Sequence, residues 1–128
     1  MKSREEEIAM LRSFIRTQVR EDRKRLNRRL QEARADFSRI VELIKDKYRP
    51  ERIYQWGSLL DGDTFRDISD IDIAVEGIRD PEVFFRLLAE CERLSSFPLH
   101  IIQIEHVHPV YREEILRKGV LVYERQVS

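Results

Sequence analysis

Residues 3–48 contain no Gly and no Pro, so this segment lacks the residues that most strongly interrupt regular structure. A single helix of that length would be about 70 Å long, whereas a compact domain of 128 residues has a radius of gyration of about 14 Å. The helix therefore either breaks near residues 20–25 or projects from the domain, and we expect the second because no strong breaker stands there. Its apolar stripe has helical spacing and requires burial in either case; it comprises Ile8, Leu11, Ile15, Val19, Leu26, Leu30, Ala33, Phe37, Ile40 and Ile44.

The charge balance excludes an overall attraction to nucleic acid or to an acidic membrane surface. The chain has 24 basic and 24 acidic side chains, and an apolar fraction of 41% is enough for the core of one ordinary domain. Acidic neighbours dilute the one local basic cluster, so we interpret it as a solvated helix face and expect no nucleic-acid partner. The cluster comprises Arg20, Arg23, Lys24, Arg25, Arg28 and Arg29.

A single cysteine, Cys91, excludes an intrachain disulfide and favours a reducing cytoplasm. It lies on the apolar face of a predicted helix, so we expect an inert core residue. No apolar run approaches the roughly 20 residues of a membrane span, and residues 1–7 lack the apolar region of a secretory signal. We therefore expect a cytoplasmic protein with no membrane-spanning segment.

The remainder of the chain, after Pro50, has the pattern of alternating strands and helices. Short runs of β-branched and aromatic residues predict strands over residues 52–56, 70–76, 98–105 and 120–123. Helices are predicted from Asp80-Pro81 onward and over residues 109–118, with His106 and His108 in a loop. The order α-β-β-α-β-α-β predicts an α/β (α+β) fold around a small mixed sheet. We divide the chain into a long helix, residues 1–48, and a domain, residues 49–128.

Two carboxylates, Asp70 and Asp72, interrupt the second predicted strand. Because alternate side chains of a strand point to opposite faces, these two share one face, while Ile71, Ile73 and Val75 share the other. Aspartate is disfavoured in strands, and two like charges so close repel each other. A divalent cation between them would remove the repulsion, and oxygen ligands suit Mg²⁺ or Mn²⁺.

Gly57-Ser58 directly follows the first predicted strand. A glycine there lets the backbone approach a ligand closely, and a serine hydroxyl with nearby backbone amides can hold phosphate oxygens. Ser69 is expected to orient the Asp70 carboxylate. Each motif alone also has a simpler explanation, as a turn or as a solvated strand face. Together they predict a site for a metal-bound triphosphate, and hence phosphoryl or nucleotidyl transfer.

The run from Gly57-Ser58 to Ser69-Asp70-Ile71-Asp72 resembles the signature of the minimal nucleotidyltransferases, small members of the DNA polymerase β superfamily. The resemblance extends over residues 52–123 and implies a palm-like domain that transfers a nucleoside monophosphate from an NTP, with ATP as the expected donor. It implies that Gly57, Ser58 and Ser69 contact the nucleotide and that Asp70 and Asp72 bind Mg²⁺. The Arg that often follows Gly-Ser in the family is replaced by Leu59-Leu60.

The third metal-binding carboxylate of the family usually stands on a later strand, where this chain has His100. A neutral imidazole is a poor ligand for Mg²⁺, although it tolerates Mn²⁺ or Zn²⁺ better. His100 is therefore expected either to take part in an altered catalytic site or to be a polar residue on a cleft wall. Glu76 and Glu105 are not substitutes, because the first lies roughly 13 Å along the strand from Asp72 and the second faces the opposite side of its strand.

Three functions are compatible with these features. The first is Mg²⁺-dependent nucleotidyl transfer to an unknown acceptor. The second, also implied by the resemblance, is a weakly active or inactive antitoxin-like module, since small members of the family often pair with helical HEPN-domain proteins as antitoxin to toxin. The third is a homodimer formed through the long N-terminal helix, whose apolar stripe needs a partner.

Overall fold

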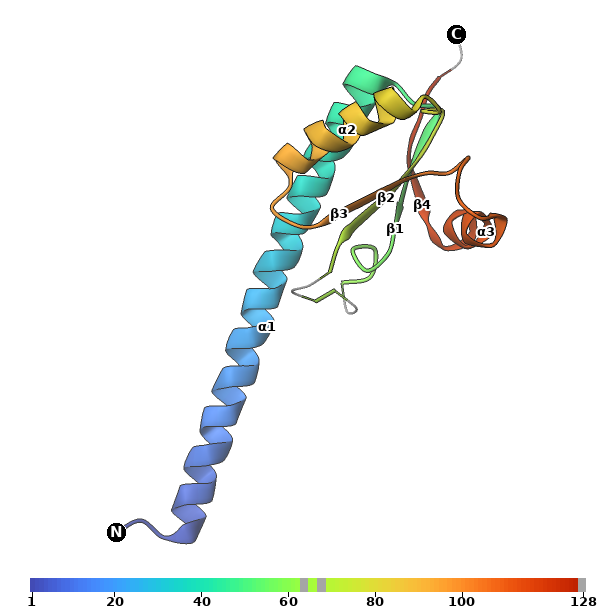
Figure 1. The fold of residues 1–128 in the computed structure, drawn as a ribbon. Coiled ribbons are helices and arrows are strands. Elements are labelled where there is room, and N and C mark those ends of the chain that lie inside the picture. The colour runs from blue at the N-terminus through green and yellow to red at the C-terminus, as the bar shows by residue number, and fades with distance from the viewer. Residues whose placement is uncertain (63–64, 67–68, 127–128) are drawn as a thin grey trace.

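The computed structural model describes residues 1–62, 65–66 and 69–126 (Figure 1). Its helices are α1 (Arg4–Leu43), which continues into the π-helical turn η1 (Ile44–Tyr48), α2 (Pro81–Leu94) and α3 (Pro109–Lys118). Its strands are β1 (Arg52–Trp56), β2 (Ile71–Glu76), β3 (Leu99–Gln103) and β4 (Val120–Glu124). This order confirms the predicted α-β-β-α-β-α-β succession. No helix of these described ranges is both long enough and apolar enough to cross a membrane.

Helix α1 is one continuous helix, as expected, and its N-terminal half projects from the rest of the molecule (Figure 1). It begins with a capping box, in which the Glu6 backbone N–H donates to the Ser3 hydroxyl at 3.1 Å. Residues 1–25 are all exposed. At its other end Arg49 takes a left-handed conformation with φ of 47°, which turns the chain just before Pro50.

The four strands form a mixed sheet in the order β3-β2-β1-β4, which confirms the predicted small mixed sheet. Strand β1 pairs antiparallel with both β2 and β4, whereas β2 pairs parallel with β3. Helix α2 makes the crossover between the two parallel strands, as parallel pairing requires. The central strands are therefore β2 and β1, the two that carry the predicted motifs.

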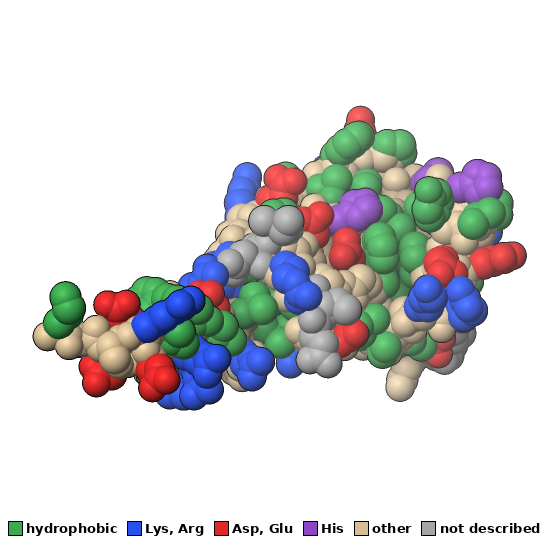
Figure 2. Space-filling model, turned by 90° about the horizontal axis from the view of Figure 1, so that it is seen from below, with side chains coloured by type: hydrophobic (Ala, Val, Ile, Leu, Met, Phe, Trp, Pro, Cys, Tyr) green, Lys and Arg blue, Asp and Glu red, His purple; other side chains and the backbone are tan. Residues whose placement is uncertain are grey.

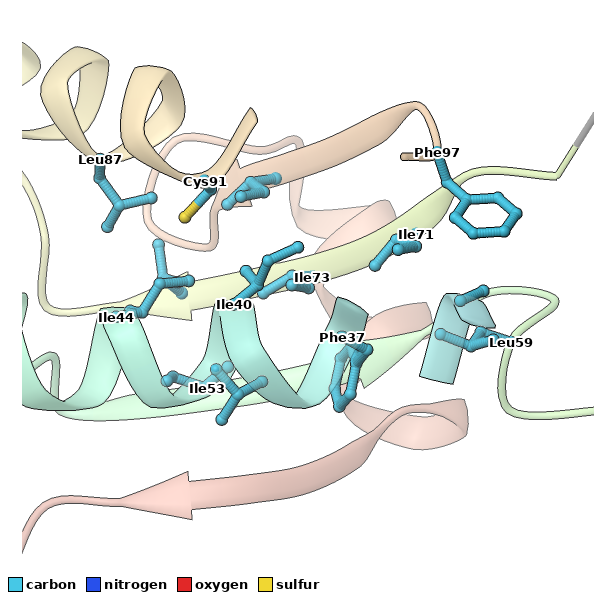
Figure 3. Packing of buried hydrophobic residues seen from close by; sticks show 14 of the residues in the cluster. Phe37, Ile40, Ile44, Ile53, Leu59, Ile71, Ile73, Leu87, Cys91 and Phe97 are labelled. Atoms are coloured by element: carbon cyan, nitrogen blue, oxygen red, sulfur yellow. The ribbon is translucent and has the colours of Figure 1, made fainter. Parts of the chain in front are cut away.

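One face of the sheet is covered by α1 and α2, which lie side by side (Figure 1). Ile71, Ile73 and Val75 of β2 all point into this core, as the alternation of the strand predicts. Figure 3 shows Ile71 and Ile73 packed among residues of both helices and the neighbouring strands. The cluster also includes Phe37, Ile40, Ile44, Ile53, Leu87, Cys91, Phe97 and Ile101. Cys91 is buried here, which confirms the expected core position, and burial raises its pKa to about 12.

The second half of α1 is joined to the domain by polar contacts as well. Asp36 is buried, and its carboxylate pairs with Arg39 and accepts a hydrogen bond from the Ser96 backbone N–H at 2.8 Å. The Arg29 guanidinium lies 4.3 Å from the centre of the Phe97 ring. From about residue 29 onward, the helix is therefore part of the domain.

The opposite face of the sheet carries α3, which packs Ile115 against Ala74 and Ile104. His106 lies in a turn and His108 just before α3, where its Nδ1 accepts a hydrogen bond from the Val110 backbone N–H at 3.2 Å. The predicted loop is thus confirmed, and His108 is the N-cap of α3. Asp72 points to this same face, in the opposite direction from the core residues of its strand.

Candidate functional site

The sheet register places three side chains in a row on the face that carries α3. Asp72 in β2 is paired with Trp56 in β1 on one side and with His100 in β3 on the other. Residues directly opposite one another on neighbouring strands lie on the same face. The Trp56 and His100 rings are close, with centroids 5.5 Å apart at an angle of 60°. The carboxylate of Asp72 therefore lies in the middle of a small polar and aromatic cluster.

The Asp72 carboxylate is in contact with both neighbouring strands. Its Oδ1 lies 3.3 Å from Nδ1 of His100. Its Oδ2 lies so close to Gly57 that a Cβ added there would be 2.1 Å away, and Gly57 has φ of +83°, which side chains rarely adopt. Two independent features therefore require glycine at position 57: its backbone conformation and the close approach of the Asp72 carboxylate. The sequence predicted this close approach for a ligand, whereas in the structure the Asp72 carboxylate makes it.

Burial of the Asp72 side chain, which is only 14% exposed, raises its pKa. The nearby His100 acts in the opposite direction, and the charge of Asp70 adds to the increase in pKa. Asp70 itself precedes the first residue of β2 and is exposed. The two carboxylates thus lie near enough to repel each other, but in different environments.

Ser58 and Ser69 lie in the connection between β1 and β2. Two consecutive hydrogen bonds, from Leu60 N to Gly57 O and from Asp61 N to Ser58 O, both 3.2 Å, form a tight turn directly after β1. The Ser69 hydroxyl accepts a hydrogen bond from the Arg66 backbone N–H at 2.9 Å, and no hydrogen bond to Asp70 is found among the described residues. The predicted connection, residues 57–68, also includes residues 63–64 and 67–68, which lie outside the described residues.

A divalent metal ion requires several oxygen or nitrogen ligands that converge on one point. Within the described part of the chain, no three His, Cys, Asp or Glu side chains gather in a group that could hold a metal ion. Asp70 and Asp72 nevertheless offer two carboxylates at one end of β2. Mg²⁺ is usually held by one or two carboxylates together with substrate phosphates and water. The residues therefore fit a Mg²⁺ ion that arrives with a nucleotide, and not a site formed by protein ligands alone.

A cavity of about 470 Å³ adjoins this cluster, between the sheet and α3. Its lining is mostly apolar, with a few polar groups at its edge, and includes Trp56, Gly57, His100, Ile102, Val107, Tyr111, Glu114, Ile115 and Lys118. The indole Nε1 of Trp56 is buried and has no hydrogen-bond partner among the described residues. The volume lies within the range typical of small-molecule pockets, roughly 300–1,000 Å³.

Sequence reasoning missed the contribution of α3 to this cavity. Tyr111, Glu114, Ile115 and Lys118 are spaced i, i+3, i+4 and i+7, which is the spacing of one helix face. The signal was present in the sequence, but only the sheet topology shows that this face meets β1 and β3. Trp56 could have been found from its place directly before Gly57, at the same strand end as the predicted motif.

Comparison with known proteins places the fold in a family. The family model described as "Polymerase beta, Nucleotidyltransferase" matches residues 38–128, more than two thirds of the chain. No curated protein sequence matches the chain significantly.

Several solved structures share the fold. A chain of a toxin–antitoxin crystal structure with AMP-PNP gives a TM-score of 0.59 at 22% identity, over 70% of this chain and 73% of that one. A chain of the toxin–antitoxin MntA-HepT gives 0.55 at 19% identity, over 73% and 74%. A proposed minimal nucleotidyltransferase gives 0.57 at 25% identity, over 71% and 93%. With the family match, these likenesses confirm the expected polymerase β-like fold, and the chain belongs to the polymerase β nucleotidyltransferase family.

Proposed function

We propose that the protein binds a nucleoside triphosphate with Mg²⁺ at the N-terminal end of β2 and transfers the nucleoside monophosphate to an acceptor. The observation that carries this proposal is the position of the Asp72 carboxylate, which lies against Gly57 and beside His100. Membership of the nucleotidyltransferase family supports it. ATP is the proposed nucleotide, because one similar structure is that of a toxin–antitoxin with AMP-PNP.

In this proposal Asp70 and Asp72 hold the Mg²⁺ ion, which when bound neutralises phosphate charge and orients the phosphate chain. The Ser58 hydroxyl, in the turn after β1, donates a hydrogen bond to a phosphate oxygen. His100 contacts Asp72 and keeps that carboxylate beside Gly57. Ser69 holds the connection in place through its hydrogen bond with Arg66.

The cavity between the sheet and α3 is the proposed position of the nucleoside. It directly adjoins Gly57 and His100, so a nucleotide whose phosphates lie at Asp72 can place its base there. Trp56 and Tyr111 offer aromatic surface to a base.

The proposed reaction is one displacement at phosphorus. An acceptor hydroxyl attacks the α-phosphorus and forms a new P–O bond, while the bond to the oxygen that bridges the α- and β-phosphorus atoms breaks. Pyrophosphate leaves with that bridging oxygen, and the hydroxyl proton passes to water. The residues of this chain contribute position and charge, since His100 replaces the carboxylate that would usually stand on β3.

A second candidate function is an antitoxin-like module that binds a helical partner of the HEPN type and has little or no transferase activity. The observation that favours it is the position of His100, which contacts Asp72 where the family usually has a third carboxylate. The site therefore has two carboxylates, Asp70 and Asp72, instead of three. The similarity to a chain of the toxin–antitoxin MntA-HepT supports such a partner. For both candidates we propose a cytoplasmic location.

Calorimetric titration with Mg·ATP tests the proposal. The proteins are the wild type, Asp72→Asn, His100→Asp, and Glu113→Gln as a matched control, because Glu113 is an exposed carboxylate of α3 outside the cavity lining. We expect the wild type and the control to bind equally. Asp72→Asn should bind at least about tenfold more weakly, since even residues that only support a metal ligand contribute 10–100-fold to metal affinity.

The outcomes separate the two candidate functions. Binding by the wild type that depends on Asp72, followed by transfer of label from α-labelled ATP to a copurified protein, would support the transferase. Binding by His100→Asp alone would contradict it and favour the antitoxin-like module. If no variant binds Mg·ATP, with Mn²⁺ as well as Mg²⁺, the site does not hold a nucleotide.

A further inference from the structure

The projecting half of α1 carries an exposed apolar stripe. Ile8, Leu11, Ile15 and Val19 repeat at helical spacing and are each between 41% and 58% exposed. Met10 and Phe14, which are 54% and 62% exposed, widen the stripe on one side. These six side chains present on the order of 600 Å² of apolar surface, which approaches the roughly 800 Å² per partner of a standard interface.

We infer that this stripe binds the same stripe of a second copy, with the two helices antiparallel. The distribution of charge along α1 favours a second copy as the partner and an antiparallel direction of the two helices. Residues 1–7 contain three acidic side chains, Glu5, Glu6 and Glu7, and two basic ones, whereas residues 20–29 contain six basic and two acidic side chains. Figure 2 shows this separation, with acidic side chains at the free end and basic ones nearer the body. An antiparallel pair sets the three glutamates of each helix beside the basic segment of the other, whereas a parallel pair would set the two basic segments beside each other.

The place of the domain on α1 also excludes the parallel arrangement. The exposed stripe continues along the helix as Leu26, Leu30, Ala33, Phe37 and Ile40, which face the core. The domain therefore lies on the same side of α1 as the stripe. Two parallel helices joined through that side would each run into the domain of the other, whereas antiparallel helices place the two domains at opposite ends.

The length of the free segment fits an antiparallel copy of itself. Pairing Ile8 with Val19 and Leu11 with Ile15 of the second copy centres the contact near residue 13, which is also the middle of the exposed residues 1–25. In this register the partner helix begins opposite Arg23, just before Leu26, the first residue that packs partly on the domain. The interface is isologous, so one self-complementary patch is enough.

Light scattering of the full-length chain, over a range of concentrations, tests the dimer. We expect a dimeric mass for the wild type and a monomeric mass for Leu11→Glu/Ile15→Glu, because each introduces a charge into the interface. Ser13→Glu is the matched control, since Ser13 lies on the far side of the same helix; it should remain a dimer. Circular dichroism must show equal helix content in all three, and Leu11→Ala/Ile15→Ala provides a second, milder disruption.

Charge reversal tests the direction of the helices. Glu5 and Arg23 lie on the same flank of the stripe and meet across an antiparallel pair. Glu5→Lys should weaken the dimer by roughly fivefold, as two exposed ion pairs are lost, and Glu5→Lys/Arg23→Glu should restore the wild-type dissociation constant. In a parallel pair Glu5 would oppose Glu5, so neither change would have this effect.

Each result decides the inference. A monomeric wild type at about 100 μM, where interfaces of this size commonly associate, would overturn it and leave the stripe to a different protein. A dimer that survives Leu11→Glu/Ile15→Glu would place the interface elsewhere. A dimer that is lost in that variant, but is insensitive to Glu5→Lys, would retain the stripe and contradict the antiparallel arrangement.

Discussion

Asp72 is subject to two opposing demands at the scale of a single residue. Its contacts with Gly57 and His100 hold a carboxylate where a metal-bound phosphate would need it. The same position buries the group and raises its pKa, with the charge of Asp70 adding to the increase. The native state must therefore accommodate a charge that the unfolded chain leaves in water, as is common at functional sites.

Asp72→Asn should consequently stabilise the protein at pH 7, by about 0.5–1 kcal/mol. Because the native pKa is above the unfolded value, the cost of the charge is complete above the native pKa. It disappears as the pH falls below the ordinary carboxyl range. Urea denaturation at pH 7 and at pH 3.5 measures the difference, and a gain in stability that is equally large at pH 3.5 would contradict this account. Affinity for Mg·ATP should fall as the pH is lowered through the raised pKa.

Substitution of two glycines with positive φ distinguishes an effect on nucleotide binding at the site from a general effect on stability. Gly57→Ala should destabilise the protein by at least about 1 kcal/mol, because of strain at φ of +83°, and should displace Asp72 and weaken Mg·ATP binding. Gly77→Ala is the matched control, with φ of +100° and a close contact to Glu51 at the far end of β2. It should lose similar stability in urea denaturation but keep its affinity in calorimetry. Equal binding by both variants would show that Gly57 has no special place in the site.

The sequence allowed some residues of the candidate site to be predicted. The residues that could not be predicted depend on contacts between distant parts of the chain. Gly57 and Asp72 were found because short-range patterns, a turn and strand alternation, carry them, and His100 was found from the resemblance to the minimal nucleotidyltransferases. The cavity depends on which strands are neighbours, and the pairing of β1 with both β2 and β4 is a long-range property that no local pattern contains. Trp56 and Tyr111 could not be placed beside His100 without it.

At the scale of elements, α1 is a helix with two different halves. Its outer half is exposed, whereas its inner half and the following η1 contribute Ile40 and Ile44 to the core shown in Figure 3. Apolar periodicity predicted the helix and its stripe along the whole length. It could not distinguish the half that packs within the chain from the half that does not, because both have the same spacing.

Substitution of one isoleucine in each half should reveal this difference. Ile40→Ala removes a fully buried side chain and should lower the free energy of unfolding by about 2–5 kcal/mol. Ile8→Ala, in an exposed position, should change it by less than about 0.5 kcal/mol when the protein is dilute and monomeric. Chemical denaturation measures both, and a large loss in Ile8→Ala under those conditions would mean that the outer half folds back on the domain.

At the scale of the whole molecule, the division of the chain into residues 1–48 and 49–128 remains a prediction. The inner half of α1, including Ala33, Phe37 and Ile40, belongs to the same core cluster as the sheet. The family match begins at residue 38, inside the helix. Both observations suggest that the unit able to fold alone begins within α1.

Two deletions test where that unit begins. At concentrations where the protein is monomeric, a chain without residues 1–25 should fold with an unchanged unfolding midpoint, because all these residues are exposed. A chain without residues 1–48 should fail to fold, because it lacks five buried core residues of the helix: Ala33, Phe37, Ile40, Val41 and Ile44. Circular dichroism with urea denaturation measures both. A cooperatively folding 49–128 fragment would support the predicted division, and the core contacts of α1 would then be accessory.

The continuity of α1 determines how its outer half is positioned relative to the site at Asp72. One unbroken helix runs from the core through the exposed residues 4–25, with neither Gly nor Pro to bend it, so the outer half continues directly from the part of α1 that packs on the domain. Any protein held by the outer half is therefore presented to the site at a fixed spacing and angle. Under the proposed function, an acceptor group is within reach of the site only if its distance from the surface bound by the outer half matches the length of this part of the helix.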